Sequence, residues 1–272
     1  MFKRKWFAYP YLGWMILFTV IPMLLVVYFA FTNSGGSFTL DNMKAVFQPM
    51  YLRVLGISIW LAFLCTLICL LVGYPAALIL ADRHVKNSSL WLVLFMLPMW
   101  MNFLVRTYAW MSLLEGSGII NTLFQALGLP KMQLIYNQPA ILLGLVYNFL
   151  PFMILPIHSV LTKMDHSLIE AAQDLGGNPL KVFAKVTLPL SVPGVLSGVT
   201  MVFVPAVTTF VISRLLGGSQ ILLYGDVIEQ QFLKVGDWNM GSALSLVVLL
   251  LLLISMTILN RFGGKEEGRT ML

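Results

Sequence analysis

Long apolar runs dominate this chain, and short polar stretches separate them. An α-helix needs about 20 predominantly apolar residues to cross the hydrocarbon core of a bilayer. Several runs approach that length, and each predicts a membrane-spanning helix. The six spans are expected at residues 11–31, 54–81, 90–114, 139–161, 193–213 and 241–260. Residues 1–272 are therefore expected to form a single all-α transmembrane domain.

The composition supports a bilayer as the solvent. Only 10% of the 272 residues are charged and 59% are hydrophobic, whereas soluble domains average about 25% charged residues. The first apolar run is too long for the apolar region of a signal peptide, and no Ala-x-Ala cleavage site follows it. We therefore expect an uncleaved first span.

The basic residues predict the orientation of the spans. An even number of spans places both termini on one side of the membrane. That side carries eleven Lys and Arg residues and six acids, whereas the opposite side carries five of each, and Arg106 lies within span three. Because basic loops stay inside the cell, both termini are expected in the cytoplasm. The net charge of +6 then reflects topology and does not indicate a nucleic-acid surface.

Motifs for catalysis or for cofactor binding are absent from the sequence. It contains no G-x-x-x-x-G-K-[ST] phosphate loop, no H-E-x-x-H and no G-x-S-x-G. No acidic residue lies deep within a predicted span, so a proton relay of carboxylates has no candidate. Cys65 and Cys69 are spaced like buried apolar residues on one helix face. We predict no catalytic residue, no metal site and no cofactor in this chain.

The longest polar stretch, SLIEAAQDLGGNPLKVFAKVTLP at 167–189, predicts a helix–turn–helix in the cytoplasmic loop 162–192. Ser167 and Glu170 have capping-box spacing, so the first helix is expected to begin at Ser167. Gly176 or the glycine after it is expected to end that helix.

Asn178 and Pro179 have the residue types of an N-cap and a first helical position, and they predict the start of a second helix. Pro189 is expected to end it. Apolar residues recur at helical spacing along both helices: Leu168, Ile169, Ala172, Leu175, Val182, Phe183 and Val186. This apolar face either lies against the ends of the spans or docks in a groove of a partner protein.

The same loop resembles the E-A-A-x3-G-x9-I-x-L-P loop of bacterial ABC importer permeases of type I. The matching residues are Glu170, Ala171, Ala172, Gly176, Val186, Leu188 and Pro189, with Val186 where the pattern usually has Ile. The resemblance implies that this loop is the coupling helix, seated in a cleft of a cytoplasmic ATP-binding subunit. ATP and Mg would then bind to that separate subunit.

Further stretches are similar to the permeases of spermidine/putrescine importers. They are VRTYAWMSLLEGSGIINTLFQALG at 105–128, NFLPFMILPI at 148–157, LLGG at 215–218 and VIEQQF at 227–232. The resemblance implies a subunit of a bacterial inner-membrane importer that forms half of the translocation pathway. Its partners would be a second permease subunit, two ATP-binding subunits and an extracytoplasmic substrate-binding protein. Related permeases for ferric iron, opines or other organic cations, and a stand-alone secondary carrier, are the alternatives.

Four residues within the predicted spans are candidates for the pathway. Arg106 either snorkels or binds backbone carbonyls, or it is a gate residue that pairs with an acid such as Glu115 or Asp226. Trp100, Tyr147 and Asn148 are expected to line the passage, where the ring faces of Trp100 and Tyr147 would attract a cation.

Two acids precede span six. Asp226 and Glu229 are spaced to share one helix face, and we expect them to attract a cation at the outer mouth. The alternative is that they are solvated loop residues or pair with Lys234. Gly194 and Gly198 open span five with the spacing of a close-packing helix face.

Overall fold

The computed structural model describes residues 8–83, 85–218 and 220–267, and this part of the chain is helical, with one isolated β-bridge. The basic segment 3–5, which contributes to the predicted orientation, lies outside the described residues. The first half contains α1 (Ala8–Met15), α2 (Ile21–Ala30), α3 (Asp41–Val46), α4 (Pro49–Ala81), α5 (Ser88–Trp100), α6 (Phe103–Leu114) and α7 (Ile119–Ala126). The second half contains α8 (Gln138–Lys163), α9 (His166–Asp174), α10 (Pro179–Val182), α11 (Leu188–Thr208), α12 (Val211–Leu216), α13 (Tyr224–Gln230) and α14 (Trp238–Glu267). Three π-helical turns, Ile16–Val20, Phe183–Thr187 and Gln231–Val235, join neighbouring helices.

The predicted spans correspond to long apolar helices in the described residues. Five are continuous: Tyr9–Ala30, Pro49–Ala81, Gln138–Lys163, Pro179–Thr208 and Trp238–Thr257. The bent pair Ser88–Trp100 and Phe103–Ala126 brings the number to six when the pair is counted as one span. The prediction of an all-α membrane fold with six spans is therefore confirmed, with two corrections to the individual spans.

Span three is not the straight helix expected at 90–114. It breaks between α5 and α6, whose segments meet at an angle of 90°. Pro98 weakens the end of α5 because it has no N–H to donate. The Asn102 side chain then starts α6 by accepting hydrogen bonds from the N–H groups of Leu104 (2.9 Å) and Val105 (3.4 Å).

Span five begins earlier than predicted, and Pro189 does not end a helix. α10, the π-helical turn Phe183–Thr187 and α11 form one continuous helical segment over 179–208. Pro189 lies in the first turn of α11, directly after the π-helical turn, where its missing N–H and fixed φ are tolerated. The proline therefore lies where the π-helical turn passes into the α-helix. The helix ends at Thr208 instead of near Ser213 because the chain turns extended at Thr209.

Helices α4, α8 and α11 pack together as the core of the bundle. Gly194 and Gly198 face α8: a Cβ at Gly194 would lie 2.9 Å from the Pro156 carbonyl oxygen, and one at Gly198 would lie 2.7 Å from the sulfur of Met153. The predicted close-packing face is therefore confirmed. Cys65 and Cys69 are fully buried in the same core as free thiols, as the sequence predicted.

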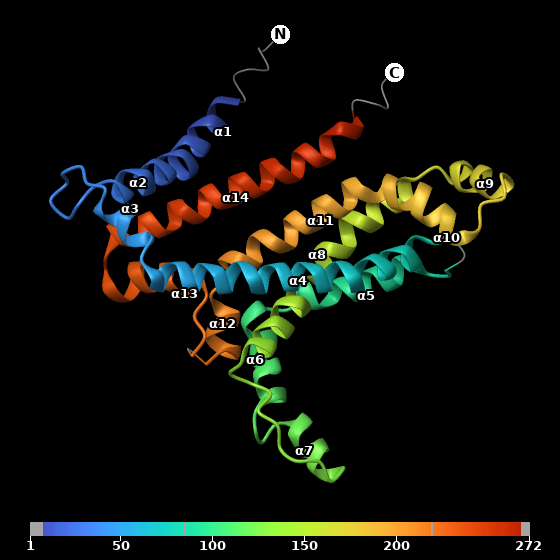
Figure 1. Cartoon of the computed structure of the whole chain (residues 1–272), viewed down its shortest axis with the longest axis horizontal. Coiled ribbons are helices and arrows are strands. Elements are labelled where there is room, and N and C mark those ends of the chain that lie inside the picture. The colour runs from blue at the N-terminus through green and yellow to red at the C-terminus, as the bar shows by residue number, and fades with distance from the viewer. Residues whose placement is uncertain (1–7, 84, 219, 268–272) are drawn as a thin grey trace.

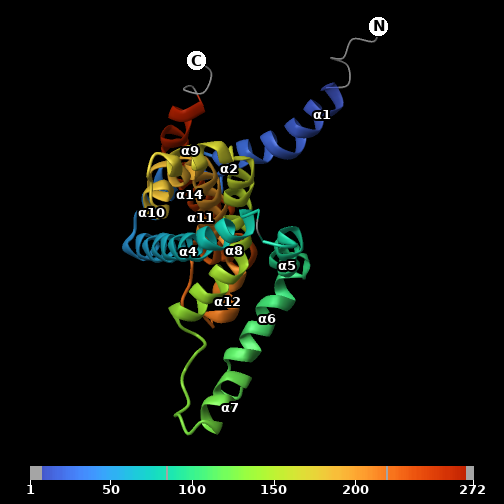
Figure 2. The ribbon, with the colours of Figure 1, turned by 90° about the vertical axis from the view of Figure 1, so that its right-hand side faces the viewer.

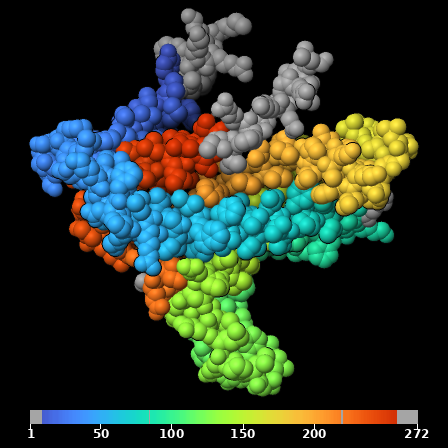
Figure 3. All heavy atoms as spheres, in the orientation of Figure 1, coloured from blue at the N-terminus to red at the C-terminus, as the bar shows by residue number. Residues whose placement is uncertain are grey.

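The long helices run along one direction of the molecule (Figure 1). The hairpin of α9 and α10 lies at one end of this direction, and α3 and α13 lie at the other. Helices α6 and α7 leave the bundle as an arm (Figure 2), which projects clear of the elongated body in the space-filling view (Figure 3). The bundle thus has the α9–α10 hairpin at one end, α3 and α13 at the other, and the α6–α7 arm along one side.

Candidate functional site

The N-cap of the first helix of the α9–α10 hairpin lies two residues before the predicted cap, Ser167. Asp165 is the N-cap, and its side chain accepts a hydrogen bond of 3.0 Å from the Ser167 N–H. This bond holds the pKa of the Asp165 carboxyl below its ordinary value. Ser167 lies in the first turn instead, so the predicted capping box of Ser167 and Glu170 is wrong. An aspartate two residues before the predicted cap is an equally good cap, and it takes the N-terminal donors first.

A Schellman motif closes the first helix at the predicted glycines. Gly176 has a φ of 80°, and its N–H donates to the Gln173 carbonyl at 2.8 Å. The Gly177 N–H donates to the Ala172 carbonyl at 3.0 Å. A Cβ at Gly177 would lie only 2.5 Å from that carbonyl oxygen. Both glycines are required here, the first for its left-handed backbone and the second for the lack of space.

The second helix is anchored to the bundle. The Asn178 side chain accepts from the Lys181 N–H at 2.8 Å, which confirms the predicted N-cap. Phe183 packs edge-on against the ring of Tyr74 in α4, with the ring centroids 5.9 Å apart. The Tyr74 hydroxyl in turn lies 2.7 Å from the Ser191 hydroxyl in α11.

The rest of the hairpin leaves apolar side chains uncovered. Leu168, Leu175 and Leu180 are 47%, 90% and 76% exposed. The rest of the apolar face is more covered: Val182 is buried, and Ile169, Ala172, Phe183 and Val186 are partly buried. The structure places the remaining loop residues as follows: Glu170, Ala171, Gly176 and Leu188 are exposed, and Ala172, Val186 and Pro189 are partly buried.

Arg106 closes the break in span three. It is 7% exposed, and its Nη1 donates to the Pro98 carbonyl oxygen at 2.5 Å. Its guanidinium lies 5.9 Å from the ring of Phe103 and 5.8 Å from the ring of Tyr147. The structure therefore confirms carbonyl binding for Arg106, and Asp226 is held elsewhere in the chain.

The predicted passage residues are not gathered on one surface. The Tyr147 ring contacts the Trp110 ring, with centroids 5.3 Å apart. The guanidinium of Arg106 also lies next to the Tyr147 ring. Asn148 is 1% exposed and donates to the Gly144 carbonyl at 2.7 Å. Trp100 is 72% exposed at the end of α5. Within this chain, the Tyr147 ring is thus next to the Arg106 guanidinium, whereas Trp100 is exposed at the end of a different helix.

Asp226 and Glu229 lie close together on α13, but Asp226 is not at an open mouth. Its side chain is 1% exposed, and its Oδ2 accepts from the Ser213 hydroxyl at 2.5 Å and from the Leu223 N–H at 2.9 Å. The expectation of an exposed acid is wrong because Asp226 is the third residue of α13, where a carboxylate reaches back to the N-terminal donors. Burial raises the pKa of this carboxyl.

Glu229 pairs with Arg214, which no motif in the sequence marks as functional. Arg214 Nη1 donates to Glu229 Oε1 at 3.2 Å, and Nη2 makes a second, shorter bond to Oε2. These bonds raise the pKa of the Arg214 guanidinium. The pairing of Glu229 with Lys234 that we considered is replaced by this bidentate pair. The only sequence signal for Arg214 is its position as a lone cation in the apolar stretch 205–217.

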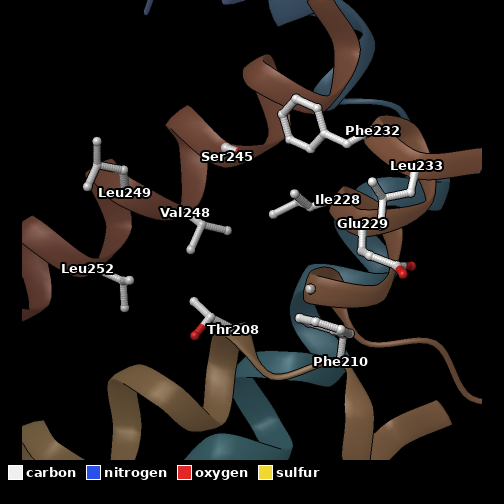
Figure 4. Close-up of a pocket in the computed structure, with 11 residues that line it drawn as sticks. Thr208, Phe210, Ile228, Glu229, Phe232, Leu233, Ser245, Val248, Leu249 and Leu252 are labelled. Atoms are coloured by element: carbon white, nitrogen blue, oxygen red, sulfur yellow. The ribbon is translucent and has the colours of Figure 1, made fainter. Parts of the chain in front are cut away.

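A cavity of about 480 Å³ adjoins this ion pair, between the end of α11, α13 and α14. Its walls are mainly apolar, and Figure 4 shows Phe210, Ile228 and Phe232 facing the α14 residues Val248 and Leu249. The Glu229 carboxylate points away from the α14 wall, at the rim (Figure 4). The cavity therefore has an apolar interior and a charged group at its rim.

Comparison with known proteins places this architecture in a family of transport components. Residues 1–263 match the model of the binding-protein-dependent transport system inner membrane component, and the chain belongs to this family. It is thus a multi-pass inner-membrane permease subunit, which confirms the resemblance to ABC importer permeases.

Among its relatives is the spermidine/putrescine transport system permease protein PotB of Haemophilus influenzae, which is 41% identical over 252 residues covering 89% of this chain and 88% of the relative. PotB of Escherichia coli strain K12 is 38% identical over 244 residues, covering 87% and 89%. The fold matches a chain of a bacterial ABC transporter involved in import of the acidic polysaccharide alginate, with a TM-score of 0.78, 17% identity and 97% of both chains covered.

Proposed function

We propose that this chain is a permease subunit of an ATP-binding-cassette importer for polyamines of the spermidine and putrescine class. The observation that carries the substrate class is the 41% and 38% identity to two spermidine/putrescine permeases over nearly nine-tenths of each chain. The fold alone does not choose the substrate, because a chain from an alginate importer shares it. The six-span bundle would form half of the translocation pathway.

The remaining subunits would lie at defined surfaces. A second permease subunit would complete the pathway, and an extracytoplasmic substrate-binding protein would deliver the polyamine. Two ATP-binding subunits would bind and hydrolyse ATP with Mg, since this chain has no phosphate loop. We place both termini in the cytoplasm on the basis of the distribution of Lys and Arg.

The α9–α10 hairpin would be the contact with an ATP-binding subunit. It lies at one end of the bundle (Figure 1), and it leaves Leu175 and Leu180 largely exposed and Leu168 about half exposed. Uncovered apolar residues on a short helix are typical of docking into a groove. The other loop residues that match the pattern of importer permeases, Glu170 among them, would position the helix within that groove.

The docking is tested by a charge placed on the hairpin. Leu175→Glu is expected to release the ATP-binding subunit during purification of the complex, because a carboxylate would have to be buried in an apolar groove. Leu127→Glu is the matched control, since Leu127 is 67% exposed and directly follows α7, which lies far from the hairpin in Figure 1. Retention of the ATP-binding subunit by Leu175→Glu would contradict this contact.

The substrate class is tested by uptake of labelled putrescine and spermidine in cells with and without this gene. We expect the gene to restore uptake, and unlabelled polyamines to compete with the label. Ferric complexes and opines are expected not to compete. Restored uptake of one of those solutes without polyamine uptake would replace the proposed substrate by that solute.

A further inference from the structure

One guanidinium at the cavity rim faces two carboxylates. Arg214, whose side chain is 36% exposed, holds both oxygens of Glu229, which is 16% exposed. Its Nη2 also lies 4.0 Å from Asp226 Oδ1. With both acids ionised, this group carries one more negative than positive charge. In that ionisation state, the rim can accept one additional cation without leaving a charge unpaired.

The second carboxylate has an unused acceptor that points to this exchange. Asp226 Oδ2 takes both hydrogen bonds to that side chain, from Ser213 and from Leu223. The buried Oδ1 has no hydrogen-bond partner among the residues that the structure describes. A movement of Arg214 Nη2 by about 1 Å would bring it within the 2.7–2.9 Å typical of a charge-assisted hydrogen bond. Arg214 thus has a second ionic partner within reach when it leaves the first.

The cavity next to Glu229 matches the other part of an aliphatic amine. Phe210, Ile228 and Phe232 form an apolar wall opposite α14, and the cavity volume is about 480 Å³ (Figure 4). Apolar walls accept a methylene chain, and aromatic rings favour nearby cations. Arg214 itself lies 5.8 Å from the Phe210 ring, which shows that this ring already accompanies a cation.

We propose that Arg214 occupies a binding site for a substrate ammonium group, and that an aliphatic polyamine displaces it from Glu229 onto Asp226. The ammonium then binds Glu229 at the rim, and the methylene chain lies in the cavity. This inference rests on the proposed function as a polyamine importer. It assigns Glu229 as a ligand of the substrate and Asp226 as a positioning residue that acts only through Arg214.

The test uses the assembled importer with its binding protein in proteoliposomes, and it measures the initial rate of putrescine uptake. Glu229→Gln removes the ligand charge and is expected to lower uptake by about tenfold or more, the usual cost of one charge-assisted contact. Asp226→Asn removes the alternative partner of Arg214 and is expected to raise the KM for putrescine. Arg214→Gln combined with Asp226→Asn is expected to recover uptake relative to Asp226→Asn alone, since nothing then competes for Glu229.

The outcomes separate this inference from the proposed function. If the native importer takes up no putrescine, the proposed function fails and the inference fails with it. If the native importer works and Glu229→Gln stays within twofold of it, only the site is wrong. If Arg214→Gln does not improve the Asp226→Asn importer, Asp226 has a structural role and the exchange is overturned. Should Asp226→Asn fail to assemble, Arg214→Gln alone is compared with the native importer, and a KM that does not fall counts against the exchange.

Discussion

At the scale of single residues, Gly176 shows how a backbone conformation supports a binding surface. Its φ of 80° turns the chain between α9 and α10, and a Cβ there would meet nothing within 4 Å. Any effect of a substitution therefore comes from the backbone and not from a steric clash.

Gly176→Val is expected to destabilise the turn by about 1–2 kcal/mol, because a β-branched residue resists a positive φ. Gly176→Asn is the matched control, since asparagine tolerates this conformation better. We expect the Val variant to assemble but to take up less substrate per ATP hydrolysed, and the Asn variant to resemble the native importer. The ratio of uptake to ATP hydrolysis in proteoliposomes measures this, and equal ratios for the two variants would contradict a role for the turn in coupling.

Residue-level roles could be predicted where local chemistry decides them. The stop at Gly176 and the N-cap Asn178 follow from neighbouring atoms, and both predictions are confirmed. The N-cap of α9 lies two residues before the predicted one, because two residues that cap well, Asp165 and Ser167, stand close together. Arg214 could not be found, because its partners lie on α13 and are brought to it by the packing of α12.

At the scale of elements, the break in span three depends on the start of α6. Asn102 accepts hydrogen bonds from two backbone N–H groups that no helical carbonyl can satisfy. Asn102→Ala is expected to lower the free energy of unfolding by about 0.5–2 kcal/mol. Asn102→Asp keeps an acceptor at the same place and is expected to be close to native. Thermal melting of the purified protein in detergent measures both, and an Ala variant that melts with the Asp variant would show that the cap is dispensable.

The contact between α8 and α11 depends on the small size of Gly198. A Cβ at this position would lie 2.7 Å from the Met153 sulfur and 3.1 Å from the Met153 carbonyl oxygen. Gly198→Ala is expected to destabilise the bundle by about 1–3 kcal/mol through overpacking. Gly56→Ala in α4 is the control, because a Cβ there meets nothing within 4 Å, and it is expected to be neutral or stabilising by up to about 1 kcal/mol. Equal melting temperatures for the two variants would mean that α8 and α11 accommodate the added Cβ with no loss of stability.

At the scale of the whole molecule, the number of spans and the fold class could be predicted because a bilayer imposes length and apolarity on every span. The bend of span three and the continuity of α10 with α11 could not, because both depend on how a proline is accommodated. Pro98 stands at a break, whereas Pro189 stands in an unbroken helix after a π-helical turn. A proline is therefore found near the end of one helix and inside another, and the residue type alone does not predict which occurs.

The orientation of the whole molecule in the membrane follows from its charges and is open to a direct test. Lys181 and Lys234 are exposed near opposite ends of the bundle, on α10 and on the π-helical turn after α13. Both side chains are therefore accessible positions for a labelling reagent.

Single cysteines are placed at these two positions in a background with Cys65→Ala and Cys69→Ala. Because eleven basic residues lie on the side of the termini and five on the other, we expect Lys181→Cys to react with a membrane-impermeant thiol reagent only in permeabilised cells. Lys234→Cys is expected to react once the reagent reaches the outer face of the inner membrane. The bulk of the positive charge would then lie inside, with the α9–α10 hairpin facing the ATP-binding subunits and the Arg214–Glu229 rim facing the side from which substrate arrives. Reversed labelling would place the hairpin outside the cell and would remove the basis for its docking to an ATP-binding subunit.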